Sequence, residues 1–367
     1  MSRVYRHIGK VGHRLNGLCK SMACLLGRKF FTLHFSLFTL NSSLFTLHFS
    51  LLLLLSSCEY KDLCYDHNHW GDLRVNFDWQ GVGGRMAPKG MTVLFYNDGQ
   101  AAQEPIRYDM AGMAGGSARL LPATYQAAAY NYDTETILYR GMENTATLEA
   151  YTRLSSIEEG TQLSPRRASM PRAVGTDGQP VILEPDPLCA AASDTFSVAR
   201  DASRTVTVMP HLRYKVVTVT ITNVPNLQYT GQFGGALSGL APSVFIESGQ
   251  LGEGCVTQAF TANVEGETTL VMKFRIFGHC PHSREGRHYD HLLTVYAILA
   301  DGSKWYYTED VTSQLHPEGS GTPGGQDDDP EISIELDGLP VPKPIVNGSG
   351  FQPTVDSWQG IEIDVGM

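Results

Sequence analysis

The sequence reads Leu73-Arg74-Val75-Asn76-Phe77-Asp78-Trp79 at the point that decides the fold, with apolar and polar residues alternating throughout. Successive side chains of an extended chain point to opposite faces, so this period of two predicts a strand with one buried face. A helix would instead need apolar residues three and four positions apart. The stretch therefore predicts a half-buried strand of a β-sheet.

Similar β-favouring runs recur along the rest of the chain, with turn signals between them. Val, Thr and Ile dominate the longest run, Tyr214 to Val224, and such branched residues favour strands. Further strands are expected at residues 91–96, 123–132, 136–139, 205–209, 243–246, 258–262, 268–277, 291–300, 305–308 and 331–336. No segment after residue 57 shows a long, capped helical stripe. Many short strands separated by turns indicate sandwiches or barrels, so we expect a mainly β protein.

The chain is long enough for two domains of ordinary size. After a tether at residues 58–72, we expect an N-terminal domain over residues 73–200 and a C-terminal domain over residues 201–367. Residues 153–180 are rich in Ser, Arg, Pro and Gly and are expected to form a long exposed loop or linker. The acidic, Gly-rich composition of residues 316–330 predicts a second flexible loop.

The first 57 residues have the pattern of an export signal. They hold seven Lys or Arg and no Asp or Glu, and residues 30–57 hold none of these four types. A basic region followed by an apolar one is typical of a signal peptide. The apolar part ends in Leu55-Ser56-Ser57-Cys58, which resembles the bacterial lipobox, where a peptidase cuts before the cysteine and the thiol receives a lipid. We therefore expect cleavage before Cys58 and a lipid on it.

An uncleaved transmembrane anchor is the alternative, because the 28 residues from 30 to 57 could cross a bilayer. Ser, Thr, His and Asn recur through residues 32–50, however, and the uninterrupted apolar block is only Leu51 to Leu55. This composition favours a short cleaved segment. A lipid on Cys58 would then hold the protein at the outer membrane without a span.

Charge and motifs exclude several classes of function. Seven of the 28 basic residues precede Cys58 and all 38 acidic residues follow it, so the chain from Cys58 onward has a formal net charge of −17. Such an acidic surface argues against a nucleic-acid partner. That part of the chain also lacks a nucleophile elbow, a zinc-protease motif and a phosphate-binding loop. We expect a protein with no enzymatic activity and no cofactor.

Histidines form two groups that are candidate transition-metal ligands. His67 and His69 lie near the N-terminus, and His279 and His282 lie in a second group that continues to His291. Imidazoles beside carboxylates could bind a metal if the loops converged. Neither spacing matches a defined zinc site, so histidines in loop or capping roles are the better interpretation.

Cysteines after Cys58 allow several pairings in an exported protein. They are Cys64, Cys189, Cys255 and Cys280. They could form two disulfides by any of three connectivities, or some could be small buried hydrophobic residues. The sequence leaves these alternatives open.

Several segments together resemble the fimbrillin-like lipoproteins of Bacteroidales, a superfamily of fimbrial subunits and anchors, and a related family of uncharacterised function. The matching segments are the lipobox, Cys58 to Cys64 with His67 and His69, Val75 to Trp79, Leu121 to Tyr125, Leu237 to Ala241 and Trp358 to Val365. The resemblance implies two tandem β-sandwich domains of transthyretin-like or Ig-like type. It also implies that there is no enzyme active site.

The resemblance further implies assembly by β-strand addition. In polymerising members a protease cuts after a basic residue and removes an N-terminal strand, so that a strand of another subunit fills the groove. The basic residues available here, Arg166, Arg167 and Arg172, lie mid-chain and not after a first strand. This departure favours a subunit that keeps its lipid, as an anchor, accessory subunit or adhesin on the cell surface. Its partners would be other fimbrial subunits and a ligand on a host or bacterial surface.

Two features bear on the choice between assembly and an alternative function. The terminal strand is the expected strand-exchange segment, with Trp358, Ile361, Ile363 and Val365. Exposed aromatic residues would instead indicate a glycan-binding outer-membrane lipoprotein for nutrient capture. The tryptophans that bear on this choice are Trp70, Trp79, Trp305 and Trp358. Core packing is the default for those on alternating strands.

Overall fold

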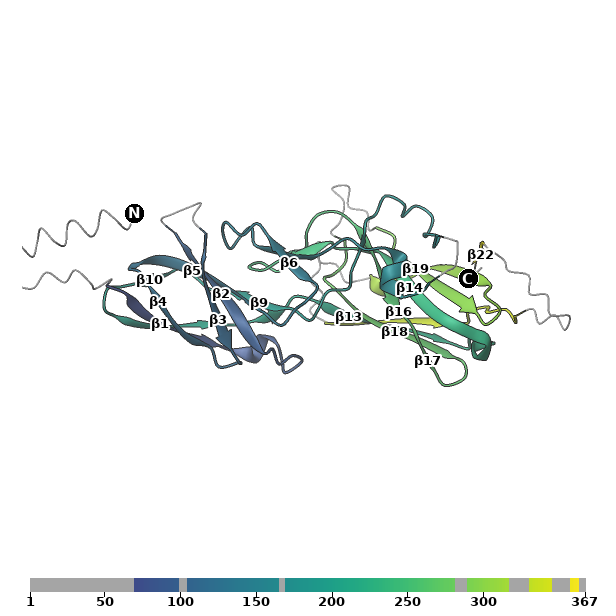
Figure 1. The fold of residues 1–367 in the computed structure, drawn as a ribbon, viewed down its shortest axis with the longest axis horizontal. Helices are drawn as coiled ribbons and strands as arrows, with labels where there is room; N and C mark the ends of the chain where they lie inside the picture. The colour runs from purple at the N-terminus through teal and green to yellow at the C-terminus, as the bar shows by residue number, and fades with distance from the viewer. Residues whose placement is uncertain are drawn as a thin grey trace, which may run out of the picture. The chain divides into compact units, whose positions relative to one another are not determined.

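The computed structural model describes residues 69–98, 104–164, 169–280, 289–316, 330–344 and 357–362. Short strands dominate these residues, and they gather in two groups (Figure 1). The expected mainly β fold is confirmed. Helical structure within the described residues is limited to single turns and to the short helices α3 (Ile157–Thr161) and α4 (Thr312–Leu315).

The first group of strands forms a sandwich of two sheets. Its strands are β1 (Gly71–Phe77), β2 (Gly90–Asn97), β3 (Ile106–Ala111), β4 (Gly116–Leu120), β5 (Ala123–Asn131), β9 (Cys189–Ala192), β10 (Phe196–Val198), β11 (Ser203–Val208) and β12 (His211–Leu212). One sheet has the order β11-β1-β4 and the other β12-β9-β5-β2-β3, with β10 paired to β5. Side chains of β1, β2 and β5 share one buried cluster, so the two sheets enclose a common core.

Strand β1 shows the alternation of apolar and polar residues that was noted for Leu73 to Trp79. Leu73, Val75 and Phe77 are buried in the core, whereas Asp72 and Arg74 are exposed. β1 lies between β11, its parallel neighbour, and β4, its antiparallel neighbour. Its hydrophobic face is therefore fixed by pairing on both sides, since a slip of one residue would expose every core residue.

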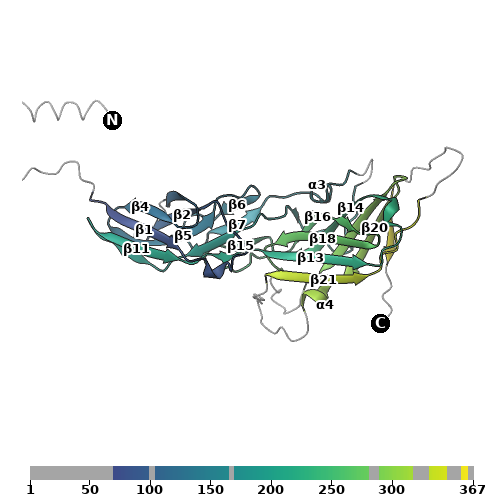
Figure 2. The same ribbon diagram turned by 90° about the horizontal axis from the view of Figure 1, so that it is seen from below.

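The second group forms another pair of sheets. Its strands are β8 (Val181–Ile182), β13 (Lys215–Thr222), β14 (Thr230–Leu240), β16 (Val256–Thr261), β17 (Asn263–Glu265), β18 (Thr269–Ile276), β19 (Leu292–Leu299), β20 (Lys304–Asp310), β21 (Glu331–Asp337) and β22 (Trp358–Glu362). The sheet orders are β17-β18-β13-β21 and β22-β20-β19-β14-β16-β8, and Figure 2 shows β18, β13 and β21 side by side in the first of these sheets. The largest buried cluster joins the two sheets, and within it the rings of Phe260 and Phe274 stack with centroids 3.7 Å apart.

Strand pairing places the division between the groups later than expected. β11 and β12 follow residue 200, the expected boundary, but pair with strands of the first group. A third sheet, of order β15-β7-β6, combines β6 (Ile137–Arg140) and β7 (Glu149–Thr152) with β15 (Ser243–Phe245) from much later in the chain. After contributing β8 to the second group, the chain returns to the first group for β9 to β12, and the last change between the groups falls between β12 and β13. A single boundary at residue 200 therefore does not divide the two groups.

Residues 153–180 were expected to form a long exposed loop or linker, and the structure corrects this expectation. It contains α3, whose N-cap residue Ser156 accepts a hydrogen bond from the backbone N–H of Glu159. Ile157 of this helix packs in a buried cluster with Leu163 and Ala259, a residue of β16. Single apolar residues spaced irregularly along a polar segment gave no period to detect, yet they cover one face of the second group.

An ion pair in the third sheet makes a prediction about acid stability. Arg140 donates two hydrogen bonds to the buried Glu149, at 2.6 and 2.7 Å, and the Ser243 hydroxyl donates a third. Hydrogen bonding from Arg140 first, opposed by burial and assisted by Ser243, lowers the pKa of Glu149 below its usual range. Because the folded-state pKa is lowered, this stabilisation is present above the unfolded-state pKa and is lost as the pH falls through the folded-state value.

We therefore expect the Glu149→Gln variant to lose about 1–3 kcal/mol of unfolding free energy at neutral pH. The variant should also lose less further stability than the wild type between about pH 6 and about pH 3, because its amide does not titrate. Urea denaturation across this pH range measures both effects. Glu104→Gln, a change at an exposed residue, is the control. A wild-type pH profile no steeper than that of Glu149→Gln would contradict the prediction.

Candidate functional site

The last described strand, β22, lies at one edge of the six-stranded sheet (Figure 1). It pairs in parallel with β20, and its register runs from Lys304 opposite Trp358 to Thr308 opposite Glu362. A parallel edge strand needs no tight turn to its neighbour. The pairing of β22 therefore depends on its own contacts with the sheet.

Side chains on both faces of β22 hold it in place. The Trp358 ring meets the buried Tyr296 ring edge-to-face at 5.5 Å, and Ile361 packs against the main core of the second group. Gly360 lies so close to Tyr306 that a Cβ there would be 2.6 Å from the hydroxyl oxygen. Of the expected strand-exchange residues, Trp358 and Ile361 thus contact the sheet, whereas Ile363 and Val365 lie outside the described residues.

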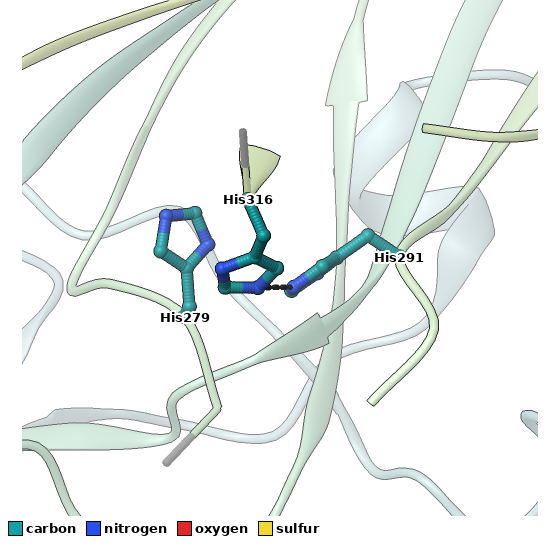
Figure 3. A group of neighbouring side chains, drawn as sticks. All are labelled: His279, His291 and His316. Atoms are coloured by element: carbon teal, nitrogen blue, oxygen red, sulfur yellow. Dashed lines mark hydrogen bonds between the residues drawn. The ribbon is translucent and has the colours of Figure 1, made fainter. Parts of the chain in front are cut away.

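Three histidines form a cluster near the start of β19, the strand that carries Tyr296. His279 follows β18, His291 directly precedes β19 and His316 directly follows α4 (Figure 3). One side-chain nitrogen of each lies within 4.8 Å of the others, and the ring centroids are 4.9 to 5.2 Å apart. The fold has therefore brought together imidazoles from three separate elements.

Hydrogen bonds orient two of these rings. His291 is buried, and its Nδ1 lies 3.1 Å from the carbonyl oxygen of Ser238. A carbonyl only accepts, so Nδ1 carries the proton and Nε2 of the neutral ring carries the lone pair. His316 Nε2 lies 2.8 Å from this Nε2 (Figure 3).

His279 differs in its surroundings. Its Nδ1 is buried and has no hydrogen-bond partner among the described residues. Burial first, and then repulsion from the two neighbouring imidazoles, lowers the pKa of His279 to about 3. The ring is therefore neutral near pH 7 and keeps a lone pair that can bind a cation.

The end of β14 fixes the positions of His279 and His291. Leu240 forms an isolated bridge with His279, and the Gly239 carbonyl accepts from the backbone N–H of Cys280. Gly239 has φ +75°, and a Cβ there would lie 2.8 Å from Nδ1 of His291. Cys280 also forms a disulfide with Cys255, which ties down the residue next to His279.

Of the four histidines expected as metal ligands, the structure describes only His69 and His279. His67 and His282 lie outside the described residues, and His69 contacts Asp201 at 3.1 Å. His279 is the one member of the expected set in the cluster. His291 was part of the same run of sequence, but His316 stood at the start of an expected flexible loop and offered no spacing signal.

The remaining expected sites have mixed outcomes. Cys58 and the lipobox residues Leu55, Ser56 and Ser57 lie outside the described residues, as do Cys64, Arg166 and Arg167. Cys255 pairs with Cys280, and Cys189 is a free buried thiol. Arg172 is half-buried and donates hydrogen bonds to the Gln179 carbonyl and the Thr257 hydroxyl. It is therefore not the freely available basic residue expected from the sequence.

Comparison with known families assigns the chain. The model of a domain family of unknown function, DUF5119, matches residues 57–261. The chain belongs to this family. The chain is also similar to a candidate fimbrium anchoring subunit, Fim4B of Bacteroides ovatus, with 25% identity over 336 residues, which are 84% of this chain and 92% of that protein. The resemblance to fimbrillin-like lipoproteins is thereby confirmed.

A solved structure supports the fold assignment of this DUF5119 member. A candidate adhesin of Bacteroides ovatus superposes with a TM-score of 0.51 at 22% identity, covering 78% of this chain and 98% of the adhesin. At this identity the likeness concerns the fold alone. It matches the two groups of strands described above.

Aromatic residues of the DUF5119 chain give no platform of exposed tryptophans within the described residues. All four, Trp70, Trp79, Trp305 and Trp358, are only half-exposed. Trp79 donates to the Met113 carbonyl and Trp305 packs on the main core. Exposed tryptophans, which would have favoured glycan binding, are therefore not found there.

None of the helices in the described part of the chain combines the length and the apolar character that a membrane span requires.

Proposed function

We propose that this protein is a non-enzymatic, cell-surface lipoprotein that serves as an anchor or accessory subunit of fimbriae. The similarity to the candidate fimbrium anchoring subunit carries the proposal, because it extends over 84% of this chain and 92% of that relative. A match of this extent spans both groups of strands and not one shared module. Two β-sandwich groups suit a protein that works by presenting sheet edges and loops.

The proposed anchor is the lipid on Cys58. Leu55 to Cys58 supply the small residues and the thiol that lipoprotein processing needs, and a basic leader without Asp or Glu precedes them. Residues 59–68 would connect the lipid to β1. Acyl chains hold a protein at a bilayer surface, and more than one chain is needed for stable attachment.

The proposed contact with the next subunit is strand addition to β20, which would become the edge strand of the sheet if β22 were displaced. β22 supports this because it pairs in parallel at that edge, with Trp358 on one side of the strand and Ile361 on the core. Backbone hydrogen bonds give such an interface its affinity, and alternate side chains set its register. A strand of a neighbouring subunit that replaces β22 would use the same positions.

A chain that ends at residue 356 tests this contact. We expect it to stay folded and to bind a synthetic peptide of residues 357–367 in trans, measured by fluorescence anisotropy. A peptide with Ile361→Asp should bind at least about tenfold more weakly, because Ile burial contributes about 1.5–3 kcal/mol. The matched control is Gln359→Glu, a change at a half-exposed polar position of the same strand. Equal binding of all three peptides would count against register-specific strand addition.

Deletion of the gene in the native strain tests the fimbrial role itself. An anchor holds the polymer to the cell, so the deletion should reduce cell-bound fimbriae and increase fimbriae shed into the medium. Complementation with the wild-type chain should restore attachment. Unchanged amounts of bound and shed fimbriae would refute the proposed role.

A further inference from the structure

We propose that His279, His291 and His316 form a binding site for one divalent transition-metal ion, with Zn²⁺ as the ion that fits best. The inference does not depend on the fimbrial role. It rests on the convergence of three imidazoles from three elements, each with one ring nitrogen within 4.8 Å of the others. His279 lies three residues after the end of β18, His291 lies directly before β19, and His316 lies directly after α4.

The ligand chemistry selects the class of ion. Imidazole nitrogen suits Zn²⁺, Cu²⁺, Ni²⁺ and Fe²⁺, whereas Ca²⁺ and Mg²⁺ prefer oxygen ligands. Within the part of the chain that the structure describes, the cluster contains three histidines and no carboxylate or thiolate. Three imidazoles provide three of the four positions of a tetrahedral Zn²⁺ ion.

The three rings would have to shift to bind one ion, because their ligand nitrogens lie within 4.8 Å of one another and an ion holds them closer than that limit. Zn–N bonds of about 2.0–2.1 Å place tetrahedral ligand nitrogens about 3.3 Å apart. The Nε2 atoms of His291 and His316 are 2.8 Å apart, so binding needs them to separate by about half an ångström. In the same step the Nε2 proton of His316 would move to its Nδ1, a change of tautomer that keeps the ring neutral and frees both Nε2 lone pairs.

His291 makes the kind of hydrogen bond that orients metal-binding histidines. A ligating histidine commonly donates its other ring N–H to a carbonyl or carboxylate, which fixes both tautomer and orientation. His291 does this through Nδ1 to the Ser238 carbonyl. Its backbone is held as well, since its N–H donates to the Thr312 hydroxyl of α4 and its carbonyl accepts from Val311.

His279 supplies an independent observation. Its Nδ1 is buried without a hydrogen-bond partner among the described residues, and Figure 3 shows this edge of the ring on the side that faces His316. A buried polar atom left without a partner destabilises the fold unless water or an ion satisfies it. A bound cation would satisfy it and would link β18 to α4.

Metal titration of the full chain, purified from membranes in detergent and stripped with a chelator, tests the site. We expect one equivalent of Co²⁺ to bind with visible absorption bands of a tetrahedral nitrogen site, and Zn²⁺ to displace it. Millimolar Mg²⁺ should not compete. His291→Gln should lower the affinity at least about 100-fold, and Gly239→Ala should lower it about 10- to 100-fold by displacing the ring that it contacts.

The controls separate this site from others. His211→Gln changes an exposed histidine of β12 and should leave the affinity unchanged. The double variant His282→Gln, His288→Gln changes two histidines outside the described residues and should also leave the affinity unchanged. Circular dichroism must show that each variant is folded, and Gly239→Ala, which keeps all three imidazoles, serves if His291→Gln is not. Binding that survives in folded His291→Gln, or that depends on His282 and His288 instead, would overturn the proposal.

Discussion

Replacing Cys58 by alanine is expected to abolish lipid attachment and to leave the protein as a longer precursor. The thiol of Cys58 is the atom that would receive the lipid, and cleavage before a lipobox cysteine depends on that modification. The accumulated chain should therefore be longer by the 57 leader residues. Metabolic labelling with a clickable fatty acid and electrophoretic mobility measure the two effects.

The expected contrast is all or none, since a chain without acyl groups has no anchor of this kind. Cys64→Ala is the matched control, because it removes another thiol six residues later and should keep both the label and the processed size. The same experiment tests the alternative of an uncleaved transmembrane anchor. Under that alternative the wild type would carry no label, and Cys58→Ala would leave its size unchanged.

Removing the Cys255–Cys280 disulfide is expected to destabilise the second group of strands by about 3.5 kcal/mol, from the loop-closure entropy of the unfolded chain. The two cysteines are 25 residues apart, and the bridge connects the segment before β16 to the segment after β18. The double variant Cys255→Ala, Cys280→Ala removes the bridge without leaving a new thiol. Urea denaturation with and without a reductant measures the change.

Reduction of the wild-type disulfide provides the control for this prediction. The wild type should lose stability on reduction and approach the double variant, which should not respond at all. Cys189→Ala removes a buried thiol that is not in a disulfide, so its response to reductant should remain that of the wild type. Wild-type stability that is the same with and without reductant would contradict the assignment.

Much of the fold could be predicted from strand periodicity. Leu73 to Trp79 alternates because one face of β1 meets the core and the other meets solvent, and this pattern needs no knowledge of partners. Tyr214 to Val224 likewise marked β13. What the sequence did not reveal is which strands pair, because β7 with β15 and β11 with β1 join residues far apart in the chain. Local patterns carry no record of such contacts.

The candidate sites show the same limit. Trp358 and Ile361 could be assigned to a terminal strand by alternation alone, and the structure places both against the sheet. The sequence indicated only part of the histidine cluster. His279 and His291 are close in sequence, whereas His316 comes from a separate element. Convergence of three loops is a property of tertiary structure, and a ligand supplied by a single turn after α4 has no spacing motif.

The most direct test of the proposed anchoring role is quantitative mass spectrometry of fimbriae purified from the surface of the native strain. We expect this chain to be present, beginning at a lipid-modified Cys58, in far smaller amount than the subunit that forms the shaft. Absence of the chain from intact fimbriae, or an amount equal to that of the shaft subunit, would contradict it.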